Sequence, residues 1–553
     1  MNLPRSAAVV VAGGGPAGLA AAIELGTRGI EVLVLEPRTE VSFDRPRAKT
    51  TSARTMEHLR RWGLADRVRQ VAPLPVAWSQ DAAFVTSLLG EEVTRFTDCF
   101  GLSPARQDSV AESGQQIAQP LLESVLREAV EQTAPACLAT GWSLAGLRES
   151  PDGVLVEARH LDGTHRQVRA QYVLGCDGSR SQTRDAIGER YTGSTDARTN
   201  FNLVFRAPGL RERIRLRSAI HYWVLDAEVP GLVGPLDLGS TWWGMVMGVD
   251  AETGERDAQR LLRHLIGPGG EDIDLDVVAT DPWTARMLIA PSYGRGRVYL
   301  VGDAVHLNPP FGGHGFNTAI GDAINIGWKL AAVLQGWAGP EILRSYEAER
   351  RPVAQQTIDE ATTNMRTLSK DLAHPSLAAI GPAGEAARRA AAREIQATKD
   401  SEFHSLGLVL GYRYDASPVV PGDAVPAPAF DPRRYVPSAR PGGRLPHAWL
   451  PDGRSLYDLL SKEMTLLLLD RRADPAPFVV EARKSGVPLG VVDISAVPLP
   501  GRDDAAMLLV RPDQHIAWRG LDPVVDPEDA AATLEVALAR QAQTRRHRAS
   551  HKP

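Results

Sequence analysis

The chain has 553 residues, of which 43% are hydrophobic and 23% charged, so it is long enough for two to four ordinary globular domains. The net charge of −5 at pH 7 argues against a dedicated nucleic-acid-binding protein. The sequence opens without a signal peptide and has no apolar run of about 18 residues, so we expect a cytoplasmic protein with no membrane partner.

Cysteine usage excludes some chemistry. The three cysteines are Cys99, Cys137 and Cys176, and none of them lies in a C-x-x-C or other metal-ligand spacing. We therefore expect no metal site and no disulfide, which fits a reducing compartment.

The first 36 residues have the pattern of a nucleotide-binding βαβ unit. Residues 7–12 (AAVVVA) are predicted as a buried strand, residues 16–28 have helical spacing, and residues 31–35 are predicted as a second strand. The turn at 13–18 reads Gly-Gly-Gly-Pro-Ala-Gly, which fits G-x-G-x-x-G. This pattern predicts a dinucleotide site, and by itself it leaves FAD and NAD open.

Each conserved feature of such a turn has a physical reason. Gly13 allows the tight turn after the strand, Gly15 lets the backbone approach a pyrophosphate, and Gly18 lets the helix pack on the sheet. The pyrophosphate would then meet the unpaired N–H groups of the helix N-terminus. Glu36 ends the second strand, where its carboxylate can accept hydrogen bonds from ribose hydroxyls.

Two later segments also end strands with glycine and an acid. Residues 175–181 (GCDGSRS) follow a short apolar strand, and Asp177 there is a candidate for contact with phosphate or ribose, although a plain β-turn would also explain the Asp-Gly pair. Residues 297–301 form a predicted strand that ends in Gly302-Asp303. Asp303 suits the ribityl hydroxyls of a flavin.

The segment after Asp303 decides between the two cofactors. Residues 308–317 read NPPFGGHGFN, and a predicted helix follows directly. The glycines can bring backbone N–H groups near a flavin ring, and a helix N-terminus stabilises negative charge on reduced flavin. The sequence therefore predicts FAD.

A stretch of different texture lies between residues 192 and 285. Short alternating strands are predicted at 202–206, 220–225 and 241–249, which indicates an antiparallel sheet inserted into the α/β domain. Aromatic residues concentrate there: Phe201, Phe205, Tyr222, Trp223, Trp242, Trp243 and Trp283. They suit a water-poor substrate pocket, and an ordinary core would explain about half of them equally well.

Together these segments resemble the single-component (class A) FAD-dependent aromatic hydroxylases with the para-hydroxybenzoate hydroxylase fold. The resemblance is carried by GDAVHLNPPFGGHGFNTAIGDAINIGWKLAAVL at 302–334 and SYEAERRPVA at 345–354. Residues 114–126 (GQQIAQPLLESVL) and 406–420 (LGLVLGYRYDASPVV) are most similar to the 2,4-dichlorophenol 6-monooxygenase and polyketide hydroxylase subgroup.

The resemblance implies an α/β (α+β) fold: a Rossmann-like FAD domain, an inserted antiparallel-sheet substrate domain and a C-terminal thioredoxin-like domain. The boundaries that we expect are 1–75, 101–190 and 286–416 for the FAD domain, 76–100 and 191–285 for the substrate domain, 417–446 for a proline-rich linker, 447–541 for the thioredoxin-like domain and 542–553 for a tail. The thioredoxin-like region has no cysteine, so it cannot exchange disulfides.

The resemblance also implies an activity. FAD would be reduced by NADPH or NADH, which binds transiently, and would then react with O₂ to form a flavin C4a-hydroperoxide that hydroxylates a phenolic or aromatic polyketide-type substrate. Baeyer–Villiger oxidation or antibiotic inactivation at the same site is the alternative, and a flavoprotein without oxidative chemistry is a third reading. A homodimer stays open.

Matching the motifs residue by residue yields the expected cofactor contacts. Arg47 matches the family arginine near the pyrophosphate, and Gln119 matches a glutamine near the flavin. The full set is Gly13, Gly15, Pro16, Ala17, Gly18, Glu36, Arg47, Gln119, Asp177, Gly302, Asp303, Pro310, Gly313, His314, Gly315, Phe316 and Asn317. His314 could touch flavin or substrate, or fill space.

Three residues are the catalytic candidates. By the resemblance, Pro309 lies over the ring face with its carbonyl toward the substrate. Hydroxylation is helped by a base that converts phenol to phenolate, with a pKa near 7. His221 and Tyr222 begin a strand of the predicted pocket and are candidates for that base, although a structural role for His221 and catalysis without a side-chain base both stay open.

Overall fold

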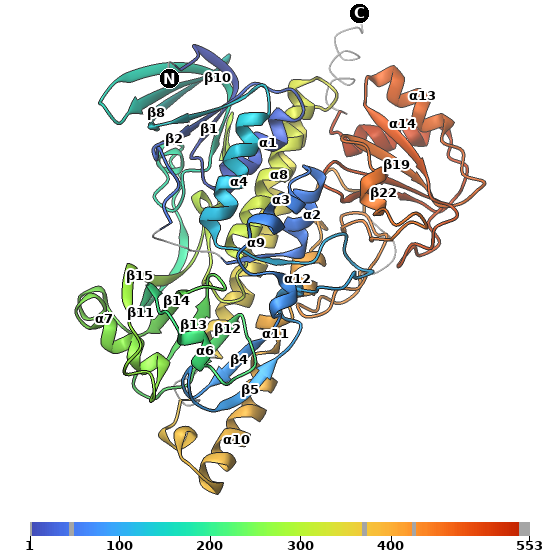
Figure 1. Ribbon diagram of the computed structural model, residues 1–553. Helices are drawn as coiled ribbons and strands as arrows, with labels where there is room; N and C mark the ends of the chain where they lie inside the picture. The colour runs from blue at the N-terminus through green and yellow to red at the C-terminus, as the bar shows by residue number, and fades with distance from the viewer. Residues whose placement is uncertain (1–2, 44–48, 368–372, 423–426, 541–553) are drawn as a thin grey trace, which may run out of the picture.

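The protein folds around three sheets, which the computed structural model describes for residues 3–43, 49–367, 373–422 and 427–540. The nucleotide-type sheet and the long central helices occupy the upper left and centre of Figure 1, the second sheet lies below them, and the C-terminal unit lies at the upper right. Within the described residues, no helix combines the length and the apolar character needed to cross a bilayer.

The first sheet is mainly parallel and is covered on both faces. Its central strand β1 (Ser6–Ala12) is fully buried at Val9, Val10 and Val11, as expected of a parallel strand that is covered on both faces. The strand order is β16 (Gly294–Arg295), β17 (Val298–Leu300), β10 (His165–Gly175), β1, β2 (Val32–Glu36) and β7 (Ala136–Thr140), with β8 (Trp142–Ser150) and β9 (Gly153–His160) added through β10.

Helices of this domain begin directly after the glycine-rich turns. Helix α1 (Pro16–Gly26) follows β1 directly, with proline at the first helical position, and packs against α4 (Gln119–Gln132) and α8 (Gly315–Leu334). The others are α2 (Ala53–Arg61), α3 (Ala65–Val71), α5 (Gln182–Ala186) and α9 (Ser345–Arg366). A short ribbon of β3 (Thr50–Thr51) and β6 (Gln115–Gln116) joins the segment before α2 to the one before α4.

The second sheet is almost entirely antiparallel. Its order is β18 (His306–Leu307), β15 (Asp276–Ile289), β11 (Thr192–Arg206), β14 (Thr241–Met247), β13 (Gly231–Pro235), β12 (His221–Val224), β4 (Ala82–Val85) and β5 (Glu92–Phe96). The boundary that we expected at residue 285 falls inside β15, because this strand runs on to pair with β18, just beyond the Gly302-Asp303 turn. The segment directly after the turn is therefore hydrogen-bonded to the second sheet.

The two faces of the second sheet have different coverings. One face packs under α7 (Ala251–Ile266) through leucines such as Leu262 and Leu265, and the short α6 (Leu210–Arg213) lies at its edge. The other face packs against Phe311, from the glycine loop before α8, and against α10 (Pro382–Thr398) and α11 (Asp400–Phe403). An aromatic layer thus lies between this sheet and the glycine loop.

The C-terminal unit is a small four-stranded sheet. Its order is β20 (Leu489–Asp493), β19 (Met464–Leu468), β21 (Met507–Val510) and β22 (Ile516–Gly520), and only the β19–β20 pair is parallel. Helices α13 (Ala476–Ser485) and α14 (Pro527–Ala537) pack against each other beside it. This arrangement fits the expected thioredoxin-like domain. Between α12 (Leu406–Leu410) and residue 455, the described residues contain no helix or strand, as the prolines predict.

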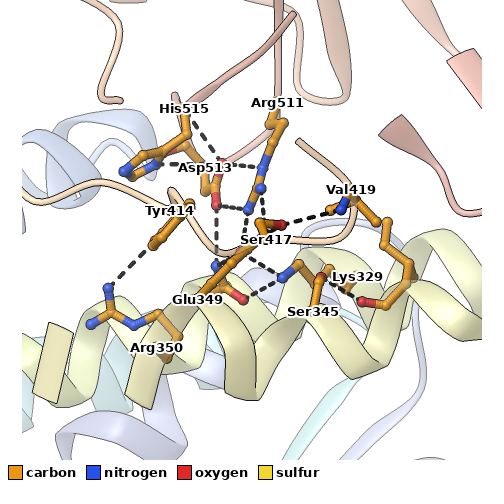
Figure 2. A network of polar contacts seen from close by, with 12 residues as sticks. Lys329, Ser345, Glu349, Arg350, Tyr414, Ser417, Val419, Arg511, Asp513 and His515 are labelled. Atoms are coloured by element: carbon orange, nitrogen blue, oxygen red, sulfur yellow. Dashed lines mark hydrogen bonds and ion pairs between the residues drawn. The ribbon is translucent and has the colours of Figure 1, made fainter. Parts of the chain in front are cut away.

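A buried ionic network fastens the C-terminal unit to α8 and α9 (Figure 2). The guanidinium of Arg511, in the turn between β21 and β22, donates to both oxygens of Glu349 at 2.7 and 2.8 Å. Lys329 of α8 also donates to Glu349, at 2.7 Å, and Ser417 donates to it at 2.7 Å. Asp513 accepts from Arg511 at 2.7 Å. The position of α8 therefore depends on a domain that follows it by more than a hundred residues.

Candidate active site

The glycine turn after β1 has the shape of a phosphate cradle. Gly13 has φ +101°, and a Cβ there would lie 2.4 Å from the carbonyl oxygen of Cys176. A Cβ at Gly18 would lie 1.9 Å from the carbonyl oxygen of Gly13, so glycine alone allows α1 to pack this closely. A Cβ at Gly15 would meet nothing within 4 Å. This open space beside the start of α1 fits a pyrophosphate bound by helix N–H groups, as the sequence predicts.

Glu36 stands where a ribose would follow the pyrophosphate. Its buried carboxylate accepts the backbone N–H of Gly14 at 2.7 Å and the N–H and Nε of Arg38 at 2.9 and 2.7 Å. A carboxylate has about four acceptor positions, so about one, on Oε2, is left for a ribose hydroxyl. The predicted role of Glu36 fits this geometry.

Asp177 is occupied by its own chain. Its carboxylate accepts the Ser181 hydroxyl at 2.5 Å and both the N–H and the hydroxyl of Thr183 at 2.9 Å, which fastens the start of α5. This geometry favours the turn interpretation that the sequence had left open. Direct contact of Asp177 with a cofactor stays a prediction.

The Gly302-Asp303 turn lies between the N-termini of two helices. A Cβ at Gly302 would lie 2.7 Å from the Cβ of Ala319 in α8 and 3.4 Å from that of Ala17 in α1. Asp303 is exposed beside this junction, and the Tyr191 hydroxyl donates to its carbonyl oxygen. The turn can therefore contact one ligand that extends from α1 to α8, which is what the two halves of FAD require.

Asp322 accepts a hydrogen bond from this turn, a contact that the sequence did not predict. Its carboxylate accepts the N–H of Gly302 at 3.3 Å, lies 2.8 Å from Nε2 of His306 and accepts Nε of Arg350 at 2.7 Å. Burial opposes charge on Asp322, yet Arg350 and His306 hold its pKa below the usual value. Its position, twenty residues after Gly302 and inside a helix, gives no local signal of this contact.

Asn317 was expected to contact the flavin, and its side chain instead fixes the loop. The amide nitrogen donates to the carbonyl oxygens of Thr50 and Gly313 at 2.9 and 2.8 Å. The amide oxygen accepts the N–H of Ser52 at 2.9 Å and the hydroxyl of Thr55 at 2.7 Å. All four hydrogen-bonding positions of the amide are used, so a contact with cofactor is left to the backbone.

In the rest of the glycine loop, as far as the structure describes it, the side chain of His314 has a buried nitrogen without a hydrogen-bond partner. Gly312 and Gly313 have φ +83° and +69°, and α8 begins at Gly315, followed by the half-buried Phe316. His314 caps the helix and is buried, which lowers its pKa to about 4 and keeps it neutral at pH 7. Within the described part of the chain its Nε2 has no hydrogen-bond partner, so it fits a polar group of a bound flavin or substrate.

The remaining predicted contacts lie around this loop. Pro309 is buried, but its carbonyl oxygen, which we expected to face the substrate, accepts the side-chain amide of Asn308 at 2.8 Å and has one lone pair left. Pro310 is exposed, and its carbonyl accepts the N–H of Gly313 at 3.0 Å. Gln119 is the half-buried first residue of α4. Arg47 lies outside the described residues.

Only one of the two candidate bases faces the glycine loop. Tyr222 points to the α7 face, where its hydroxyl accepts the N–H of Ala219 at 2.9 Å and donates to the carbonyl of Arg217 at 3.3 Å. Neighbouring side chains of a strand point to opposite faces, so Tyr222 lies on the face away from the glycine loop, which does not favour it as the substrate base. His221 lies on the loop face beside Phe100, and burial together with Lys49 keeps its pKa well below the ordinary value.

Lys49 is a further residue that the sequence reasoning missed. It precedes β3, and its side chain reaches across to the second sheet, where Nζ donates to the carbonyl oxygens of Ile220 at 2.8 Å and Pro235 at 3.1 Å. Nζ also lies 5.8 Å from the ring centroid of Trp243. A lone lysine in a loop gives no sign of such burial, because only the packing of β3 against the second sheet directs it there.

Comparison with known proteins relates the chain to flavin-dependent enzymes. Residues 6–361 match the family described as FAD binding domain, and residues 438–542 match the family described as the C-terminal region of aromatic-ring hydroxylases. Phenol 2-monooxygenase of Pseudomonas sp. (strain EST1001) is 32% identical over 570 residues, which cover 94% of this chain and 91% of that protein. 2,4-Dichlorophenol 6-monooxygenase of Delftia acidovorans is 31% identical over 572 residues, which cover 93% and 94%.

A solved structure is similar over the same length. The flavin-dependent monooxygenase PieE, crystallised in complex with FAD and substrate, superposes with a TM-score of 0.84 at 30% identity and covers 97% of this chain and 98% of its own. The chain therefore belongs to the family of FAD-dependent aromatic hydroxylases. It is an FAD-dependent monooxygenase, and the predicted cofactor and fold class are confirmed.

Proposed function

We propose that this monooxygenase uses NADPH or NADH and O₂ to hydroxylate a phenolic or aromatic polyketide-type substrate. The observation that carries the proposal is the aromatic layer between the glycine loop and the second sheet. Trp223 stacks on Phe311 of the loop with ring centroids 6.2 Å apart, and on Phe84 of the neighbouring strand at 5.8 Å. A flat apolar substrate is the ligand that such a layer recognises.

The residues of the site divide the work of binding and shielding. The glycine turn, Glu36 and Asp303 hold the nucleotide and ribityl parts, and the N-terminus of α8 stabilises negative charge near the ring. Reduced FAD held there would supply the activation of O₂, and the oxygen atom that is transferred would come from O₂. The aromatic layer keeps water away from the reacting atoms, which protects the oxygenating species from unproductive decay.

The nature of the substrate follows the relatives as well as the site. Similar proteins are named for phenol and 2,4-dichlorophenol, and others for polyketides. No feature of the described site favours a ketone or an antibiotic over a phenol, so the Baeyer–Villiger alternative is not carried further.

A panel of aromatic compounds tests the proposal. The purified holoenzyme is mixed with NADPH or NADH and with phenol, 2,4-dichlorophenol or a dihydroxyanthraquinone, and nicotinamide oxidation and product mass are followed under labelled O₂. We expect one of these compounds to stimulate oxidation and to gain one labelled oxygen atom. Oxygen gained by a cyclic ketone, and by none of the phenols, would overturn the proposal.

A further inference from the structure

Lys49 occupies a gap in the loop-facing side of the second sheet. His221, Gly234 and Trp243 stand side by side on β12, β13 and β14, because Gly234 pairs with Trp243 and His221 is level with Gly234 in the β12–β13 register. A Cβ at Gly234 would lie only 2.7 Å from Nζ of Lys49. Because Gly234 has no side chain, it leaves room for the amine of Lys49 between the imidazole of His221 and the indole of Trp243.

The same residue is anchored beside the flavin loop. The next residue, Thr50, accepts the side-chain amide of Asn317 at 2.9 Å, and its Cβ would lie 3.2 Å from a Cβ built on Gly313. The residue after Lys49 thus contacts the glycine loop, while the amine of Lys49 is bonded to the second sheet. The side chain of Lys49 therefore extends from beside the glycine loop to the second sheet, the two parts of the protein between which we expect the substrate.

The two hydrogen bonds of the amine can be made by its neutral form. A neutral amine has two N–H groups and one lone pair, and the carbonyls of Ile220 and Pro235 accept two N–H bonds. The one position that remains on the nitrogen is then a lone pair. Burial lowers the pKa of Lys49 to about 7, so a large fraction of the amine is neutral at physiological pH.

The groups packed around Lys49 do not compete for this proton. His221 is the titratable group that faces it from β12, and its own pKa lies well below the usual value, so it stays neutral near pH 7. Strand β13 presents Gly234 and Pro235, and β14 presents Trp243, whose ring can stabilise an ammonium at this distance.

We propose that Lys49 is the catalytic base that takes the proton of the substrate phenol. The inference rests on the proposed hydroxylase function and names the residue that prepares its substrate. In this step the phenolic O–H bond breaks, its electron pair stays on oxygen, and a new N–H bond forms at the lone pair of Lys49 Nζ. The products are a phenolate, which is more reactive toward an electrophilic oxygen, and an ammonium that holds it in place.

Lys49→Met tests the proposal, since it keeps the length of the side chain and removes the base. The test compares kcat/KM as a function of pH for whichever panel phenol the parent enzyme hydroxylates. For the parent we expect the rate to rise with pH and level off above about 7. For Lys49→Met we expect a loss of about 100-fold near neutral pH, with the rate still rising toward the pKa of the phenol used, which is about 10 for a phenol without electron-withdrawing substituents.

Two further variants separate a base from a structural residue. Lys49→Arg keeps the cation but cannot release its proton, so it should lose activity as Lys49→Met does, with FAD content unchanged. Lys484→Met, at an exposed lysine of α13, should keep the parent rate and pH profile.

The outcomes distinguish this inference from the function on which it rests. If the parent enzyme adds oxygen to no phenol, the proposed function falls and the role of Lys49 falls with it. If the parent hydroxylates a phenol while Lys49→Met keeps both its rate and its pH profile, the function stands and Lys49 is not the base. Equal loss at every pH, with no recovery toward pH 10, would also overturn the base assignment and leave Lys49 as a packing residue.

Discussion

Replacing Arg511 by methionine should weaken the packing of the C-terminal domain against α8 and α9 and lower the free energy of unfolding. The guanidinium is fully buried and makes four bonds, two to Glu349 at 2.7 and 2.8 Å and two to Asp513 at 3.1 and 2.7 Å. Breaking a buried ion pair by removing one partner costs about 3–5 kcal/mol. Glu349 keeps Lys329 and Ser417 as partners, so we expect the lower end, about 3 kcal/mol.

The loss can be measured by urea unfolding of the holoenzyme. Trp328 is a suitable fluorescent reporter, since its ring centroid lies 5.1 Å from the guanidinium carbon of Arg511, and flavin fluorescence reports the release of FAD. We expect the unfolding midpoint to fall and FAD to dissociate at a lower urea concentration, because Lys329 belongs to α8, whose N-terminus is part of the proposed cofactor site.

Arg472→Met is the matched control. Arg472 pairs with Asp470 at 2.8 Å, but its side chain is 77% exposed, and exposed pairs contribute about 0–1 kcal/mol. Replacing Arg511, Glu349, Asp513 and Lys329 together by apolar residues should recover part of the stability, since the four buried charges of the network are then removed together. Equal urea midpoints for the Arg511 and Arg472 variants would refute the role assigned to the network.

Four further changes have expected results. Asp303→Ala should purify with little FAD, seen as low flavin absorbance relative to protein, because a charged acceptor contributes about 1.5–3 kcal/mol; full flavin occupancy would remove Asp303 from the site. Gly18→Ala should also lose FAD and unfold at lower temperature, since its Cβ would lie 1.9 Å from a carbonyl oxygen; an unchanged melting temperature would contradict the required close packing. Asn317→Ala should raise the Kd for FAD without abolishing folding, because it removes four hydrogen bonds of the loop. Acid should destabilise the protein between about pH 4.5 and 2, because Arg511 and Lys329 outweigh burial and lower the pKa of Glu349 to about 2; stability that stays constant over this range would disprove that contribution.

Local sequence signals predicted the elements that depend on neighbouring residues. The G-x-G-x-x-G turn with its flanking strand and helix, the strand that ends at Gly302-Asp303 and the helix after the glycine loop all lie where the sequence placed them, to within a few residues. Glycine spacing, strand alternation and proline positions act over a few residues, so their consequences can be deduced from the chain alone. The same local motifs were sufficient to predict FAD and the family.

Contacts between distant segments were decided by the tertiary structure. The sequence could not tell which of His221 and Tyr222 would face the glycine loop, since that depends on how β12 pairs with β13 and β4. Nor could it tell that Asn317 would spend its whole amide on holding the loop, or that Asp322 would support Gly302.

Lys49 shows the difference most clearly. In the sequence it is one lysine in a polar loop, where a solvated side chain is the ordinary expectation. In the fold, the β3–β6 ribbon directs it onto the gap at Gly234, and burial in that gap changes its acid–base behaviour. The sequence by itself determined the cofactor and the class of enzyme, because both depend on contiguous motifs. The arrangement in front of the flavin was decided only where three strands, a loop and a lysine from separate parts of the chain meet.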